Sequence, residues 1–109
     1  MNPFERQTEI LNNLVQIMHD EASDKYQKMN CRFEINLEEG WSETKFSFIE
    51  NDVEISKAIS ENYTWAIHDM LQELHIAMKE HTGGKWDYFT LSLEKDGRAH
   101  TKFHYPEKE

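Results

Sequence analysis

The C-terminal part of the chain holds two consecutive runs in which apolar and polar residues alternate, and this pattern constrains the fold more than any other. Residues 85–105 read KWDYFTLSLEKDGRAHTKFHY. In the first run, Phe89, Leu91 and Leu93 are separated by single residues, which is the period of two expected for a strand buried on one face. The second run alternates in the same way, so the two runs predict an antiparallel hairpin.

The register of this hairpin depends on the length of its turn. A two-residue loop, Asp96-Gly97, would place Phe89 opposite His104 and mix the apolar and cationic faces. A three-residue loop that begins at Lys95 keeps the faces separate when Gly97 adopts the left-handed conformation of a bulged turn. We therefore expect three facing pairs: Phe89 with Phe103, Leu91 with Thr101, and Leu93 with Ala99.

The same stretch carries a motif beyond its periodicity. A tryptophan follows a glycine-containing helix exit, and then come a Phe-Thr-Leu-Ser-Leu run, an Asp-Gly turn and an aromatic-x-Tyr ending. This motif resembles the C-terminal signature of the YezG-like immunity (antitoxin) family. The matching residues are Trp86, Phe89, Thr90, Leu91, Leu93, Asp96, Gly97, Phe103 and Tyr105. The resemblance implies that the protein neutralises a toxin, and that the toxin is a nuclease.

The rest of the chain predicts two helices and a second hairpin. Apolar residues recur at three and four over residues 3–22 and again over residues 56–80, which is the helical period. Between them, residues 29–37 alternate with a period of two, and a turn in residues 38–41 leads to a second strand. We expect Phe33 to face Phe46, and Cys31, a buried small residue, to face Phe48.

These elements predict one α+β domain over residues 1–109. Its order is helix, strand, strand, helix, strand, strand, with both helices packed on one face of antiparallel hairpins. The single cysteine excludes an internal disulfide and indicates a reducing compartment. No signal peptide or bilayer-spanning run is present in the sequence, so we expect a cytoplasmic protein with no membrane partner.

The composition also bears on the partner. Lys and Arg number 12 against 21 Asp and Glu, and the net charge of −9 disfavours nucleic acid and favours a basic protein. Arg98, His100, Lys102 and His104 make a cationic row on one strand, which we interpret as a solvated sheet face rather than a nucleic-acid surface.

Catalytic and metal-binding patterns are weak. His68 and His75 lie seven residues apart rather than the four of a zinc helix. The sequence shows no phosphate-binding loop and no nucleophile with an evident base. We therefore expect no cofactor, no metal and no enzymatic activity.

Acidic residues concentrate in one segment. Residues 34–54 contain seven acids and a single basic residue, so six of the nine net negative charges lie there. A solvated surface and a contact for a basic partner are both open explanations. The residues expected to contact a partner are Glu38, Glu39, Glu43, Glu50, Asp52 and Glu54.

Trp65 stands out on the second predicted helix. At 100° per residue it lies about 160° from Ile67, the centre of the apolar stripe, and Asp69, Gln72 and Ile76 share its side. Either the first helix covers this second stripe, or the stripe is an exposed anchor for a partner. We add Trp65, Asp69, Gln72 and Ile76 to the candidate partner-binding residues.

These observations lead to a functional prediction. We expect a cytoplasmic immunity protein that binds a cognate toxin, a basic nuclease domain, and occludes its substrate-binding surface. The alternative is an interaction or adaptor domain without a toxin, with a homodimer as one of its forms. A third reading is an enzyme whose site the sequence does not reveal.

Overall fold

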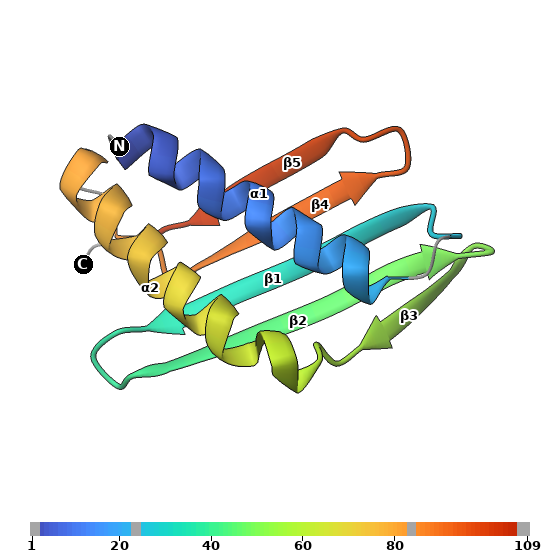
Figure 1. Cartoon of the computed structure of the whole chain (residues 1–109), viewed down its shortest axis with the longest axis horizontal. Coiled ribbons are helices and arrows are strands. Elements are labelled where there is room, and N and C mark those ends of the chain that lie inside the picture. Colours follow the sequence, from blue (N-terminus) through green and yellow to red (C-terminus); the bar gives the residue numbers. More distant parts are fainter. Residues whose placement is uncertain (1–2, 23–24, 83–84, 107–109) are drawn as a thin grey trace.

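The protein is a two-layer α+β domain in which both helices cover one face of a single sheet (Figure 1). The computed structural model describes residues 3–22, 25–82 and 85–106. In chain order the elements are α1 (Pro3–Glu21), β1 (Lys28–Asn36), β2 (Trp41–Glu50), β3 (Val53–Lys57), α2 (Glu61–Thr82), β4 (Tyr88–Glu94) and β5 (Ala99–His104). The five strands are antiparallel and lie in the order β3-β2-β1-β4-β5. The predicted fold class is confirmed.

The C-terminal hairpin has the predicted register. Phe89 faces Phe103, Leu91 faces Thr101 and Leu93 faces Ala99. Gly97 has a φ of 93°, and its amide donates to the carbonyl of Glu94 at 2.9 Å. The separation of apolar and cationic faces was therefore sufficient to predict the turn length.

The register predicted for the first hairpin is wrong by two residues. Cys31 faces Phe46 rather than Phe48, and Phe33 faces Thr44. The predicted pairing needs a two-residue turn at Glu39-Gly40, and both tight hairpin turn types require positive φ at Glu39. Among the described residues of this turn only Gly40 has positive φ, at 75°, and a longer loop over residues 37–40 connects the strands.

The structure contains a third strand, β3, that the sequence analysis assigned to a loop and the start of the second helix. Asn51 and Asp52 both have positive φ, at 53° and 62°, so they form a tight two-residue turn of the hairpin type. The chain then pairs with β2 before α2 begins at Glu61 rather than near residue 56. Ser60 precedes the helix and accepts a hydrogen bond from the amide of Asn62 at 3.4 Å, as a capping residue does.

One core lies between the helices and the sheet. It contains inward-facing side chains of α1, α2, β1, β2 and β4 together with Trp86, which is 1% exposed. Cys31 is part of this core, and burial raises the pKa of its thiol, so it is not poised as a nucleophile. Leu37, the last residue of the predicted strand 29–37, is 39% exposed because β1 ends at Asn36 and the chain has already begun to turn there.

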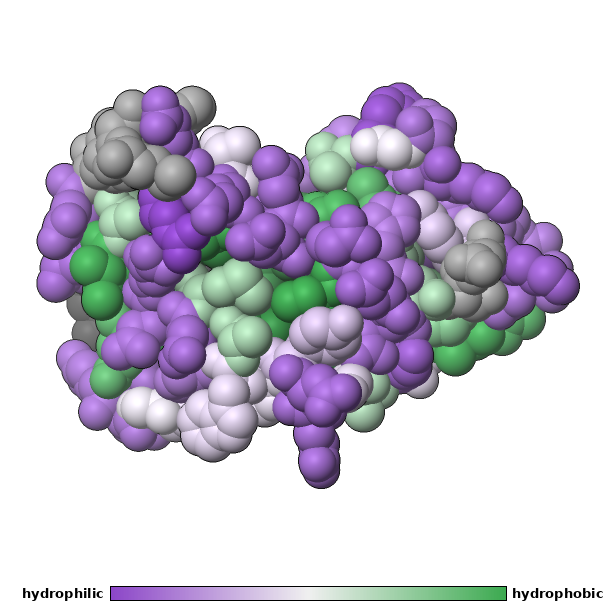
Figure 2. Space-filling model, viewed as in Figure 1, coloured by the Kyte–Doolittle hydropathy of each residue, from purple (hydrophilic) through white to green (hydrophobic). Residues whose placement is uncertain are grey.

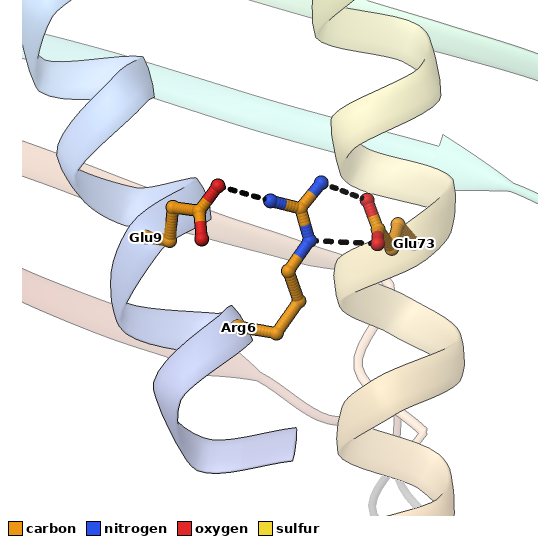
Figure 3. Close-up of polar contacts among 3 residues, drawn as sticks. All are labelled: Arg6, Glu9 and Glu73. Carbon is orange, nitrogen blue, oxygen red and sulfur yellow. Dashed lines mark hydrogen bonds and ion pairs between the residues drawn. The ribbon is translucent and has the colours of Figure 1, made fainter. Parts of the chain in front are cut away.

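Polar contacts join the helices to each other and to β3. Arg6 on α1 donates to both carboxylate oxygens of Glu73 on α2, at 2.7 and 2.5 Å, and also to Glu9 (Figure 3). The buried carboxylate of Glu21 accepts from the amide of Ser60 at 2.9 Å and pairs with Lys57 at 3.2 Å. The end of α1 therefore fixes both the end of β3 and the start of α2.

Candidate partner-binding surface

The outer side of α2 is a solvent-exposed stripe. Trp65 is 76% exposed and Ile76 is 46% exposed, and Asp69 and Gln72 between them are also exposed. The opposite side of this helix buries Ile67, Leu71, Leu74 and Met78 in the core. Of the two explanations for the second apolar stripe, exposure is the one that the structure supports.

The position of α1 explains why Trp65 stays uncovered. α1 contacts α2 through Glu73 and Tyr63, whose hydroxyl lies 3.2 Å from the carboxylate of Asp20. At 100° per residue, Glu73 lies about 80° around the helix from Trp65. The neighbouring His68 instead bonds Ser42 of β2 at 2.7 Å and contacts the Trp65 ring edge-on, with ring centroids 6.0 Å apart. The stripe thus runs beside the start of β2.

The predicted acidic residues fall at two opposite ends of β2. Glu38 and Glu39 lie in the turn that precedes this strand, with Glu43 close behind them. Glu50, Asp52 and Glu54 lie at the far end, around the turn into β3. A ten-residue strand is about 30 Å long, so the six acids cannot form one compact patch.

The two acidic groups also differ in their surroundings. Glu39 accepts from the indole nitrogen of Trp41 at 2.9 Å, and Glu43 lies 3.5 Å from the ammonium of Lys45. At the far end, Asp52 bonds Gln27 through both its side chain and its amide. The first group lies beside the C-terminal end of the α2 stripe, because Glu38 and Ile76 line the same hollow.

This hollow, of about 680 Å³, lies between the β1–β2 turn and the C-terminal half of α2. Its apolar lining comes from Ile35, Leu37, Ile76, Trp86 and Pro106, and its polar lining from Asn36, Glu38, His75, Lys79, Glu80, Lys85 and Asp87. Leu37, Ile76 and Pro106 are the exposed apolar residues of this set. The hollow therefore extends the exposed stripe with a recess whose lining is partly apolar.

Two buried nitrogen atoms lie in the wall of this hollow. Among the described residues, the indole nitrogen of Trp86 and Nδ1 of His75 have no hydrogen-bond partner, and their rings lie 5.0 Å apart. Burial lowers the pKa of His75, and it outweighs a hydrogen bond to the Trp86 main chain that raises this pKa. The charges of Lys79 and Lys85 also lower it, so the neutral ring is favoured at pH 7. The sequence analysis missed the hollow, and the only signal for it was Trp86 within the C-terminal motif.

Three further features bear on the kinds of site that this domain presents. Within the described ranges, no group of three or more His, Cys, Asp or Glu side chains could hold a metal ion. In the same ranges, no helix is long and apolar enough to cross a membrane. The cationic row on β5 is broken up by local pairs, because Arg98 bonds Glu94 and Asp96 and His104 bonds Asp87.

Comparison with known proteins identifies the family. No curated protein sequence matches the chain. The family model described as immunity protein YezG-like matches residues 40–109, which is 70 of the 109 residues. The match covers β2 to the C-terminus and so includes the exposed stripe of α2 and most of the hollow. The chain belongs to the YezG-like immunity protein family.

Proposed function

We propose that this immunity protein neutralises a cognate nuclease toxin by covering the basic surface with which the toxin binds its substrate. The observation that carries the proposal is the 76% exposed Trp65, because an aromatic side chain left uncovered on a small domain is a typical interface anchor. Farther along the same side of α2, Ile76 lines the hollow beside the acidic β1–β2 turn.

Charge supports the choice of partner. A nuclease must present Lys and Arg side chains to phosphate groups, and a domain with a net charge of −9 is attracted to such a surface. Covering that surface is sufficient for inhibition, since the substrate can no longer reach it. The proposed contact surface consists of Glu38, Glu39, Glu43, Trp65, Asp69, Gln72 and Ile76.

The acidic residues at the other end of β2 are not included in the proposed contact surface. Glu50, Asp52 and Glu54 lie about 30 Å from the β1–β2 turn, at about 3.3 Å per strand residue, and they do not line the hollow. They contribute to long-range attraction through the total charge rather than through contact.

A growth assay tests the function. The toxin domain encoded beside this protein is expressed in a host with and without the protein, and an inactivated toxin serves as the control. We expect arrest by the toxin alone and growth when both proteins are present. Arrest in the presence of abundant, folded protein would overturn the proposal.

A further inference from the structure

The two edges of the sheet differ in how well they are protected. β3 forms one edge, and all five of its residues are exposed. Val53 is 59% exposed and Ile55 is 37% exposed, and Figure 2 shows hydrophobic surface at the lower right, where Figure 1 places this strand. An exposed edge strand with apolar side chains is a template for pairing with another strand.

The opposite edge, β5, carries the usual protection against such pairing. Lys102 is exposed in the middle of the strand, and Pro106 follows its end. On β3 the only lysine, Lys57, points back to Glu21, with which it forms an ion pair at 3.2 Å and a hydrogen bond to the main-chain oxygen. Glu54 is then the only charged side chain left to discourage pairing along β3.

The register of β3 shows which of its main-chain groups face outward. The tight turn at Asn51-Asp52 makes Glu50 and Val53 the hydrogen-bonded pair that closes the hairpin. Because such pairs alternate with non-bonded pairs along an antiparallel ladder, Glu54 and Ser56 direct their N–H and C=O groups away from β2. These four groups are available to a further strand.

We propose that β3 pairs antiparallel with β3 of a second copy of this chain, with Ile55 opposite Ile55 of that copy. In this register the main-chain N–H and C=O of Glu54 bond the C=O and N–H of Ser56 in the second copy. Ser56 bonds Glu54 of that copy in the same way, so the pairing has four main-chain hydrogen bonds. Shifting the centre to Glu54 would place two carboxylates directly opposite each other, which is unfavourable. Shifting it to Ser56 would separate the two isoleucines. The result is one continuous sheet with a two-fold axis at Ile55.

Cysteine cross-linking tests the register. In the proposed dimer, Ile55 forms a non-hydrogen-bonded pair with its copy, whose Cα atoms lie about 4.5 Å apart, within the range a disulfide spans. Ile55→Cys is therefore expected to form a covalent dimer under mild oxidation. Val53→Cys is the matched control, because it lies on the same face and is more exposed but sits about 13 Å along the strand from its copy. Cross-linking of both variants at the same rate would overturn the proposed register.

Analytical ultracentrifugation over a concentration series tests the pairing itself. A five-residue edge buries less than the roughly 1,200 Å² of a stable interface, so we expect reversible dimerisation in the upper micromolar range. Ser56→Pro removes an outward N–H and should weaken dimerisation at least about tenfold, whereas Thr101→Pro on the other edge should not. A wild-type monomer at all concentrations would overturn the proposal. If Ser56→Pro abolished toxin binding but left dimerisation unchanged, the β3 edge would be a contact surface for the toxin and the proposed dimer would be wrong. The inference does not depend on the proposed function.

Discussion

Trp65 and Trp86 lie in two regions that use the same side chain in opposite ways. Trp86 is 1% exposed, and its ring contacts those of His75, Phe89 and Phe103 at centroid distances of 5.0 to 5.6 Å. Trp65 is 76% exposed, and its one aromatic neighbour within the described chain is His68. The same side chain therefore holds the core together at Trp86 and stays exposed on the surface at Trp65.

The largest effect is expected at Trp86. Trp86→Ala should lower the free energy of unfolding by about 3–5 kcal/mol, because it removes a buried ring and leaves a cavity among aromatic neighbours. Urea denaturation followed by circular dichroism measures this loss. A change of less than about 1 kcal/mol would mean that Trp86 is not part of the core.

Trp65→Ala should affect binding rather than stability. We expect the free energy of toxin binding to weaken by about 2 kcal/mol, or roughly 30-fold in Kd, with the free energy of unfolding changed by less than about 0.5 kcal/mol. Isothermal titration calorimetry and thermal denaturation measure the two quantities. Val53→Ala, an exposed apolar side chain at the far end of β2, is the control and should bind normally. A large fall in melting temperature for Trp65→Ala would place this side chain in the core.

A smaller effect is expected from the titration of His75. Because burial lowers the pKa of its folded form below the ordinary value of 6.5, the unfolded chain takes up the proton first as the pH falls. The stability that the neutral ring provides is present above pH 6.5 and is lost as the pH falls through the lowered pKa.

His75→Phe should therefore lose less stability on acidification than the wild-type protein. Unfolding free energies measured across this range for both proteins give the difference. His100→Phe, at an exposed position on β5, should follow the wild-type curve. Identical curves for His75→Phe and the wild type would show that the His75 ring is hydrated.

The smallest effect on stability is expected from reversing charges at the β1–β2 end. Changing Glu38, Glu39 and Glu43 to Lys should leave the unfolding free energy within about 0.5 kcal/mol, since exposed charges contribute little. The association rate with the toxin and its salt dependence should both fall.

The same charge change at the far end of β2 is the control for this experiment. Changing Glu50, Asp52 and Glu54 to Lys alters the net charge equally, and the unfolding free energy of this variant is measured too, because Asp52 lies in the tight turn and bonds Gln27. Stopped-flow measurements at low salt should show a smaller loss of rate for this second variant. An equal loss in both would mean that total charge, and not the acidic turn, guides association.

The sequence predicted some parts of the fold better than others for a physical reason. In the C-terminal hairpin a slip of one residue would exchange the buried and exposed faces, so alternation alone chose the register. In the first hairpin the error was a slip of two residues, which keeps every side chain on its own face. Only the turn conformation distinguishes these two registers, and it depends on the positive φ of Gly40.

β3 left only a weak signal in the sequence. Val53 and Ile55 alternate with Glu54 and Ser56, but the run spans only five residues and leads directly into the helical pattern predicted from residue 56. Its turn uses Asn51 and Asp52 rather than the Asn-Gly pair that usually indicates a tight hairpin. The side chain that anchors its end, Lys57, bonds Glu21, which lies 36 residues earlier.

The candidate surface was predictable only in part. The helical position of Trp65 showed that it points away from the core, but not whether α1 covers it. The hollow forms where the β1–β2 turn, the end of α2 and the segment before β4 come together in space. These segments are far apart in the sequence, so no local sequence pattern predicts that they are neighbours. For the same reason, one acidic segment in the sequence becomes two separate groups in the structure.

The central claim, neutralisation by binding, is tested most directly by titrating the protein into a fixed amount of active toxin. Because binding silences one toxin per complex, residual nuclease activity should fall linearly and reach zero at a fixed, low molar ratio. Because Trp65→Ala weakens binding, its titration curve should bend gradually near equivalence instead of ending sharply, at the same molar ratio. Complete inhibition far below equivalence would contradict the account, since only a catalyst can silence many toxin molecules per copy.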